Sequence, residues 1–386
     1  MAGFFILIAV AWALATIVLA RALAAIWPDA WARWIRVAFT LHVVAMASIV
    51  MVMAVSSRTR SPWLPIGLGL FIPFVASFGA LLATSPIWAT LAVWSRPARN
   101  DDRRRFLRAS IATIPLASAG SGPAGAVSAY SGPVLRRIEI SFASLPPELD
   151  GLKILQISDV HLGPFVGVDQ VERAVALAAP HRPDLVALTG DIADDYEKLL
   201  PALRAIERLE APLGAFAIFG NHENARGRDA AARIYAKTRI RLLVREGVLI
   251  DRAGKRIWLG GGDDPMGLGD FYAPYLEKTA ALTDIGCPDD VSFKVMLTHR
   301  PLGWHGAKGR GYDLTLAGHT HGLQVAAFGR SIFEPWFPEE SLLGLYWDGE
   351  AALYTTAGLG HWIPFRLNCP TEVPLIVLRR PKPRER

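Results

Sequence analysis

The chain has 386 residues, of which 52% are hydrophobic, with 41 lysines and arginines, 35 aspartates and glutamates, and two cysteines. This composition excludes a disordered, a collagen-like or a disulfide-stapled protein, because such chains are poor in apolar residues, periodic in glycine or dense in cysteine. The length predicts two or three domains, and the apolar fraction with 12 tryptophans predicts that part of the chain lies in a membrane.

The positive charge lies in the first third of the chain. Residues 1–135 hold 11 arginines and three aspartates, whereas residues 136–386 carry a net charge of −2. A nucleic-acid site needs basic residues around it. The charge of the second part therefore argues against a nucleic-acid partner.

Three uncharged runs occupy the first 95 residues. The runs 2–20 and 37–57 are each long enough to cross about 30 Å of hydrocarbon as a helix. The run 61–95 is long enough for two short helices or for one long kinked helix. We therefore expect residues 1–95 to form a transmembrane helical region with three or four spans.

Residues 96–135 combine a basic loop with a weakly apolar linker. The segment Arg103-Arg104-Arg105-Phe106-Leu107-Arg108 resembles a twin-arginine export signal, although Asp102 stands where serine or threonine is usual. Export would make the linker a fifth span and place the rest of the chain in the periplasm. An ordinary basic loop would leave the rest in the cytoplasm. We expect a multi-pass protein of the bacterial inner membrane, in contact with the lipid bilayer, with the periplasmic side favoured.

Residues 136–380 have the pattern of an α/β domain, followed by a basic tail at 381–386. Segments of helical periodicity such as 168–179 separate short apolar runs of strand length. The predicted strands are 152–157, 185–188, 215–219, 293–297 and 314–316. Strands that alternate with helices predict a buried sheet.

Each predicted strand is followed by residues of types that commonly bind divalent metal ions in proteins. The five motifs are Asp159-Val160-His161, Gly190-Asp191, Gly220-Asn221-His222-Glu223, Thr298-His299 and Gly318-His319-Thr320-His321. Open α/β sheets place their ligands at the carboxyl ends of strands. Carboxylate, amide and imidazole donors without thiolates indicate Mn, Fe, Co, Zn or Mg. Seven candidate ligands suit two divalent ions, bridged by a carboxylate and a water-derived hydroxide, better than one ion.

These motifs resemble those of the calcineurin-like metallophosphoesterase superfamily over roughly residues 150–325. The resemblance implies two packed mixed β-sheets flanked by helices, and a site for two metal ions. By position, it implies one ion bound by Asp159, His161 and His321 and another bound by Asn221, His299 and His319, with Asp191 bridging them. It assigns His222 as a catalytic histidine, either a general acid or a stabiliser of the transition state. No substrate-binding residue is assigned.

A narrower resemblance concerns the bacterial membrane-associated or exported phosphodiesterases of this superfamily. It rests on the twin-arginine-like segment and on the late segments Tyr354–Gly360 and Arg366–Pro370. Relatives in that branch include enzymes that split the pyrophosphate of UDP-diacylglucosamine, a lipid A precursor. We therefore expect a membrane-anchored phosphohydrolase that attacks a phosphodiester or pyrophosphate of a lipid-linked or cell-envelope substrate with a metal-bridging hydroxide. A nuclease or nucleotide phosphodiesterase, and a catalytically silent membrane sensor, are the alternatives.

Three further features lie outside these motifs. The glycine-rich segment Gly260–Asp264 is interpreted as a flexible turn, since no lysine or helix start follows it as in a phosphate loop. His361 and Trp362 are candidates for the mouth of the cleft. Cys287 and Cys369 would pair only if the domain is exported and the fold brings them together.

Overall fold

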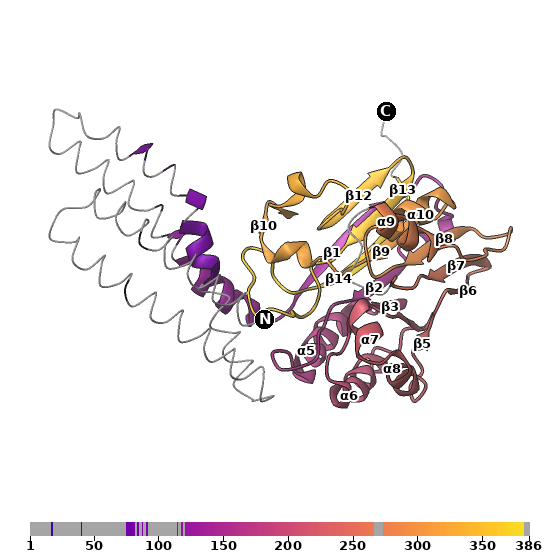
Figure 1. Cartoon of the computed structure of the whole chain (residues 1–386). Helices are drawn as coiled ribbons and strands as arrows, with labels where there is room; N and C mark the ends of the chain where they lie inside the picture. Colours follow the sequence, from indigo (N-terminus) through magenta and orange to yellow (C-terminus); the bar gives the residue numbers. More distant parts are fainter. Residues whose placement is uncertain are drawn as a thin grey trace. The chain divides into compact units, whose positions relative to one another are not determined.

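The computed structural model describes residues 120–265 and 273–381 and, before them, residues 17, 40, 75–81, 83–84, 87, 90–91, 114 and 117–118. The chain divides into two compact units. The first comprises Met1–Tyr130 and Ile363–Phe365, and the second comprises Ser131–Trp362 and Arg366–Arg386. The strands of the described residues all belong to the second unit (Figure 1).

The structure corrects the predicted multi-span membrane region and, with it, the predicted multi-pass inner-membrane location. Among the described residues, no helix is both long and apolar enough to span a bilayer. An uncharged composition is not sufficient, because a span needs about 20 consecutive helical residues. The runs 2–20 and 37–57, except for residues 17 and 40, and the twin-arginine-like loop lie outside the described residues.

The first of two six-stranded sheets has the strand order β1-β14-β2-β3-β4-β5. Its strands are β1 (Val134–Ser141), β2 (Lys153–Ile157), β3 (Leu185–Thr189), β4 (Ala215–Ile218), β5 (Arg241–Leu242) and β14 (Glu372–Arg379). Strands β2 to β5 are parallel, whereas β14 is antiparallel to β2 and parallel to β1. The sheet is therefore mixed, and the end of the chain completes it.

The second six-stranded sheet has the order β12-β13-β9-β8-β7-β6. Its strands are β6 (Glu246–Arg252), β7 (Lys255–Gly261), β8 (Phe293–Leu297), β9 (Leu314–Ala317), β12 (Gly344–Asp348) and β13 (Ala351–Thr355). The four inner strands are parallel, and the edge strands β6 and β12 are antiparallel to their neighbours. A short hairpin, β10 (Ala326–Ala327) and β11 (Arg330–Ser331), lies between β9 and β12 in sequence.

Helices connect the strands of both sheets (Figure 1). The α-helices are α5 (Val168–Ala178), α6 (Tyr196–Glu207), α7 (Asn221–Arg226), α8 (Arg228–Tyr235), α9 (Ala273–Ala281) and α10 (Gly303–Gly309). Short 3-10 helices are η1 (Pro147–Leu149), η2 (Ala179–His181), η3 (His321–Gln324) and η4 (Glu334–Trp336). The predicted helix 168–179 and the five predicted strands are confirmed to within one or two residues.

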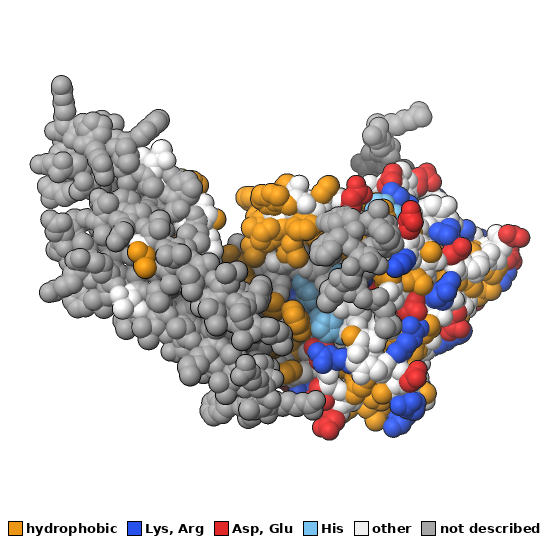
Figure 2. Space-filling view, in the orientation of Figure 1, with side chains coloured by type: hydrophobic (Ala, Val, Ile, Leu, Met, Phe, Trp, Pro, Cys, Tyr) orange, Lys and Arg blue, Asp and Glu red, His pale blue; other side chains and the backbone are white. Residues whose placement is uncertain are grey.

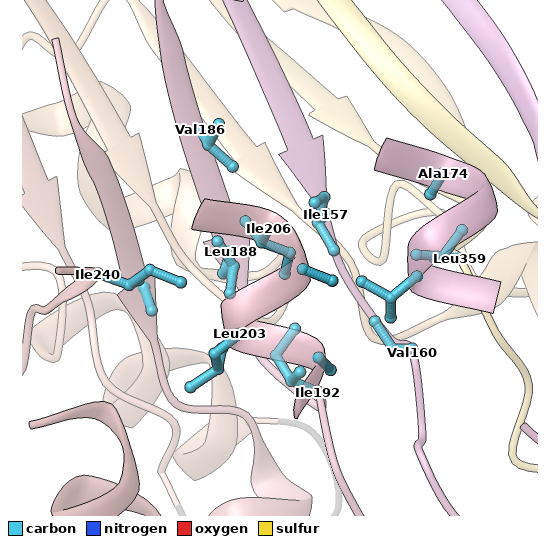
Figure 3. Close-up of a cluster of buried hydrophobic side chains, with 14 of the residues drawn as sticks. Ile157, Val160, Ala174, Val186, Leu188, Ile192, Leu203, Ile206, Ile240 and Leu359 are labelled. Atoms are coloured by element: carbon cyan, nitrogen blue, oxygen red, sulfur yellow. The ribbon is translucent and has the colours of Figure 1, made fainter. Parts of the chain in front are cut away.

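Two apolar clusters stabilise the second unit, one on each face of the first sheet. The strands of that sheet are therefore buried on both faces. In β2, Ile154 packs among residues of both sheets, whereas the next residue, Leu155, faces the helices. Figure 3 shows the helical side, where Leu203 and Ile206 of α6 lie against Leu188 of β3. Each fully buried aliphatic side chain contributes about 1.5–3 kcal/mol. The sheets thus pack face to face, and the prediction of an α/β domain with packed mixed sheets is confirmed.

Candidate metal centre

The five predicted motifs meet at the carboxyl ends of strands from both sheets. The side chains that converge there are Asp159 and His161 after β2, Asp191 after β3, Asn221 and His222 after β4, His299 after β8, and His319 and His321 after β9. Histidine side chains gather on one face of the second unit (Figure 2). The two sheets share this edge, so residues up to 160 positions apart in sequence come into contact.

One group of donor atoms consists of Asp159, His161 and His321. The Nε2 atoms of His161 and His321 lie 3.1 Å apart, and His321 Nε2 lies 3.5 Å from Asp159 Oδ1. The three residues are buried. Two imidazole nitrogens and a carboxylate oxygen therefore point at one small volume.

A second group surrounds His299. Its Nε2 atom lies 3.3 Å from Asp191 Oδ2, 3.1 Å from Asn221 Oδ1 and 3.2 Å from His319 Nδ1. Asp191 Oδ2 also lies 3.8 Å from His161 Nε2 in the first group. The Asp191 carboxylate thus stands between the two groups.

The residues present fit a pair of divalent cations. In the first group, and among Asp191, His299 and His319, the donor atoms all lie within 4.8 Å of one another. They are oxygens and imidazole nitrogens, and no thiolate is among them. Like charges and lone pairs gathered in a buried volume repel one another unless protons or cations lie between them. Seven such side chains at one point are difficult to explain by packing alone.

Backbone strain marks the same residues. Five candidate ligands have left-handed backbone angles, namely Asp159 (φ 51°), His161 (φ 51°), Asp191 (φ 53°), His319 (φ 69°) and His321 (φ 51°). The left-handed conformation costs a non-glycine residue about 1–2 kcal/mol. Residues in such conformations concentrate at functional sites, where the surrounding structure holds them.

Two glycines keep the space around the cluster open. Gly190 has φ 88°, and a Cβ atom there would lie 2.7 Å from His299 Nδ1. A Cβ atom on Gly318 would lie 2.0 Å from Asp159 Oδ2. Any other residue at either position would therefore displace a candidate ligand.

His222 lies at the edge of the cluster and is held by Asp194. His222 Nδ1 lies 2.5 Å from Asp194 Oδ1, which also accepts a hydrogen bond from Arg226 Nε. His222 Nε2 lies 3.9 Å from Asp191 Oδ2. Burial lowers the pKa of His222, but the hydrogen bond to Asp194 and the charges of Asp191 and Asp194 raise it by more.

Glu223 fixes the loops after β3 and β4 to each other. Its carboxylate accepts hydrogen bonds from the backbone amides of Asp191, Ile192 and Gly220, at 2.7–2.9 Å. Sequence reasoning gave no role to Asp194 or to Glu223. A signal for both existed, because each is an acidic residue within three positions of a predicted ligand.

Arg300 and Asp264 form a buried ion pair beside the second group. Arg300 Nε lies 2.6 Å from Asp264 Oδ2, and Arg300 Nη1 lies 2.5 Å from His319 Nε2. The segment Gly260–Asp264 is not the flexible turn that we predicted. Gly260 and Gly261 belong to β7, and Asp264 is buried. No local sequence signal pairs Asp264 with a residue 36 positions away.

The charge states of the cluster follow from its contacts. Burial lowers the pKa of His299, but the charge of Asp191 and a hydrogen bond to it raise that pKa to about 10. Burial raises the pKa of Asp191, but His299 holds it well below its usual value. Burial lowers the pKa of His319 and of His321, and the nearby guanidinium groups lower both further. At neutral pH, Asp191 and His299 are therefore charged, whereas His319 and His321 are neutral.

The remaining candidates occupy different environments. Trp362 is 57% exposed, and its ring centroid lies 6.1 Å from that of His222. His361 is buried and packs near Phe165. Cys287 and Cys369 are both free, so they do not form a disulfide.

Several known proteins are similar to this chain. A family model described as calcineurin-like phosphoesterase matches residues 152–323. The chain is 30% identical to phosphodiesterase YaeI of Escherichia coli, over 72% of this chain and 98% of YaeI. It is 27% identical to the uncharacterized metallophosphoesterase YkuE of Bacillus subtilis, over 72% of this chain and 97% of YkuE. It is 29% identical to a transmembrane protein with metallophosphoesterase domain from Bos taurus, over 66% of this chain and 59% of that protein.

The chain belongs to the calcineurin-like phosphoesterase family. The predicted superfamily is thereby confirmed, and the protein is a metal-dependent phosphoesterase. This membership argues against the alternative of a catalytically silent sensor.

Proposed function

We propose that the protein is a phosphodiesterase that hydrolyses a phosphodiester or pyrophosphate bond at a site for two divalent cations. The observation that carries this proposal is the place of Asp191, whose carboxylate lies between two groups of buried donor atoms with His222 at their edge. Paired metal sites in phosphoesterases have this form, with one carboxylate shared by two ions about 3.5–4 Å apart.

Seven side chains would hold the two cations. Asp159, His161 and His321 would bind the first and Asn221, His299 and His319 the second, with Asp191 contributing to both. When bound, two such cations supply Lewis acidity at phosphorus and lower the pKa of a coordinated water. The strained loops and the carboxylate of Glu223 hold the ligands in place before any cation binds, so little reorganisation accompanies binding.

His222 is proposed to act on the phosphoryl group rather than on a cation. Its Nδ1 atom is engaged by Asp194, which leaves Nε2 directed toward the cluster. Because its pKa is raised, His222 keeps its proton to higher pH than an ordinary histidine, and it can donate that proton through Nε2 to a phosphoryl or leaving-group oxygen. Asp194 positions the ring and stabilises its protonated form, as a carboxylate does for a catalytic histidine.

The proposed activity is hydrolysis of a phosphodiester or pyrophosphate bond, and it does not include the lipid-linked substrate predicted from the sequence. Lipid-linked material was expected from the predicted membrane anchor, and UDP-diacylglucosamine from the resemblance to exported phosphodiesterases; among the described residues, no helix is long and apolar enough to cross a bilayer. A nuclease remains less well supported, because residues 136–386 carry a net charge of −2 and a nucleic-acid groove needs basic residues.

The substrate class is tested with two chromogenic esters. The full chain, loaded with Mn²⁺, is assayed on bis(p-nitrophenyl) phosphate and on p-nitrophenyl phosphate, with EDTA-treated protein as control. We expect hydrolysis of the diester at a higher kcat/KM than that of the monoester, and none after EDTA treatment. Preference for the monoester would contradict the phosphodiesterase assignment.

Cation binding should release a proton. The pKa of His299 is about 10, so the ring is protonated at neutral pH and must lose that proton to bind a cation. Below pH 10, apparent affinity should therefore rise with pH, by about tenfold per unit for each proton displaced. Calorimetric titration with Mn²⁺ in buffers of different ionisation enthalpy measures the protons released. Affinity that is constant from pH 6 to pH 8 would contradict His299 as a ligand.

A further inference from the structure

A buried cation borders the cluster on the side of His319. Arg300 is 7% exposed, and its Nε atom is fixed by Asp264, whose side chain is fully buried. Asp264 is held in turn, because its backbone carbonyl accepts a hydrogen bond from Asn224 Nδ2 of α7. The guanidinium group therefore has a defined position at the edge of the site, set by β7, α7 and the loop after β8.

The contact of Arg300 with His319 leaves the guanidinium group able to bind an anion. A guanidinium group only donates hydrogen bonds, so His319 Nε2 must accept from Arg300 Nη1 across their 2.5 Å contact. The accepting ring nitrogen carries no negative charge, whereas an oxyanion is ionised and pairs with a guanidinium group through short and often bidentate hydrogen bonds. An oxyanion would thus be a better acceptor for Nη1 than the ring nitrogen.

Arg366, which stands behind His321, does not share this role. Its guanidinium group is fully buried and donates to the backbone carbonyls of Ala357, Gly360 and Cys369 as well as to His321 Nδ1. Three carbonyl partners make Arg366 a support for the loop before β14. Arg300 instead pairs with the carboxylate of Asp264 and borders the cluster.

We propose that Arg300 is a phosphate-binding residue of this site, which donates from Nη1 to a nonbridging oxygen of the phosphoryl group while Asp264 holds its Nε atom. This inference deepens the proposed function, on which it rests for the identity of the ligand as a phosphoryl group. It adds a fixed positive charge from the chain itself to the charge that cations would supply. A transition state gains negative charge on its nonbridging oxygens, and such preorganised donors stabilise it.

The test is equilibrium binding of inorganic phosphate to the Mn²⁺-loaded full chain by calorimetry. Arg300→Met should weaken phosphate binding about 10- to 100-fold, the loss expected for one charge-assisted hydrogen bond, with the number of bound Mn²⁺ ions unchanged. Arg300→Lys keeps the charge and loses the planar fork, so its affinity should fall between those of the wild type and Arg300→Met. Arg228→Met is the matched control, because Arg228 pairs with the neighbouring Asp263 at 2.9 Å and, among the described residues, also contacts Asn224 and the ring of Phe219, neither of which is a candidate ligand. This variant should bind phosphate within twofold of wild type.

Two results would overturn the inference. Phosphate binding by Arg300→Met that equals wild type would show that Nη1 has no anion partner. Loss of Mn²⁺ in parallel with phosphate would show that Arg300 only holds His319 in place. If Arg300→Met does not fold, as judged by thermal unfolding, Arg300→Lys decides, and wild-type phosphate affinity in that variant would contradict the role. Because binding is measured without turnover, a protein that binds phosphate through Arg300 and cleaves no ester would refute the proposed function alone.

Discussion

Replacing Asp191 by asparagine should remove both metal binding and hydrolysis. Its carboxylate lies between the two donor groups, so one substitution withdraws a charged ligand from each of them. Loss of a residue that only supports a ligand costs about 10- to 100-fold in metal affinity, and loss of a shared ligand should exceed that range. Bound Mn²⁺ is measured by elemental analysis after dialysis, and activity by hydrolysis of bis(p-nitrophenyl) phosphate.

A half-buried aspartate outside the site provides the matched control for Asp191→Asn. Asp313 precedes β9, at the opposite end of that strand from His319, and accepts a hydrogen bond from the amide of Lys294 at 2.7 Å. Asp313→Asn should lower thermal stability while the protein keeps its metal and its activity. If Asp191→Asn retained two Mn²⁺ ions per chain, the Asp191 carboxylate would not be a ligand shared by the two donor groups.

Replacing His222 by alanine should slow hydrolysis about 10²- to 10⁴-fold, the usual contribution of a positioned general acid, and leave metal content nearly unchanged. The reason is that His222 lies 3.9 Å from Asp191 at the edge of the cluster and donates nothing that the donor groups need. Single-turnover rates and metal analysis on the same preparation measure both quantities. Metal loss as large as that of Asp191→Asn would overturn this separation of roles.

Replacing Asp194 by asparagine should change the pH dependence of hydrolysis while His222 itself is kept. It keeps the side chain's size but removes the charge that helps to raise the pKa of His222. The protonated form of His222 then persists only to lower pH, so the fall of activity on the alkaline side should move to lower pH than in wild type. A pH profile identical to that of wild type would contradict Asp194 as the positioning residue.

Local sequence patterns were sufficient to predict the strand ends and the residues gathered there. β2, β3, β4, β8 and β9 are short apolar runs, each followed by a polar motif, and strands buried on both faces have this continuous apolar character. The carboxyl ends of parallel strands in one sheet share an edge, so Asp159 after β2 and Asp191 after β3 could be expected to meet there from the sequence. The family resemblance then divided the ligands into two sets.

Other features depend on contacts that no local pattern encodes. β14 is formed by the last strand of the chain and lies between β1 and β2, so its place is set by long-range pairing. The ion pair of Arg300 with Asp264 also joins distant segments. The membrane region was predicted from the lengths of uncharged runs. Among the described residues, however, no helix is both long and apolar enough to span a bilayer.

The dinuclear centre is tested most directly by electron paramagnetic resonance of the full chain during titration with Mn²⁺. Two ions that share the Asp191 carboxylate at about 3.5–4 Å should give a spin-coupled spectrum that saturates at two Mn²⁺ per chain, and the coupling should vanish in Asp191→Asn. Saturation at one ion, or two ions with uncoupled spectra, would contradict a shared site.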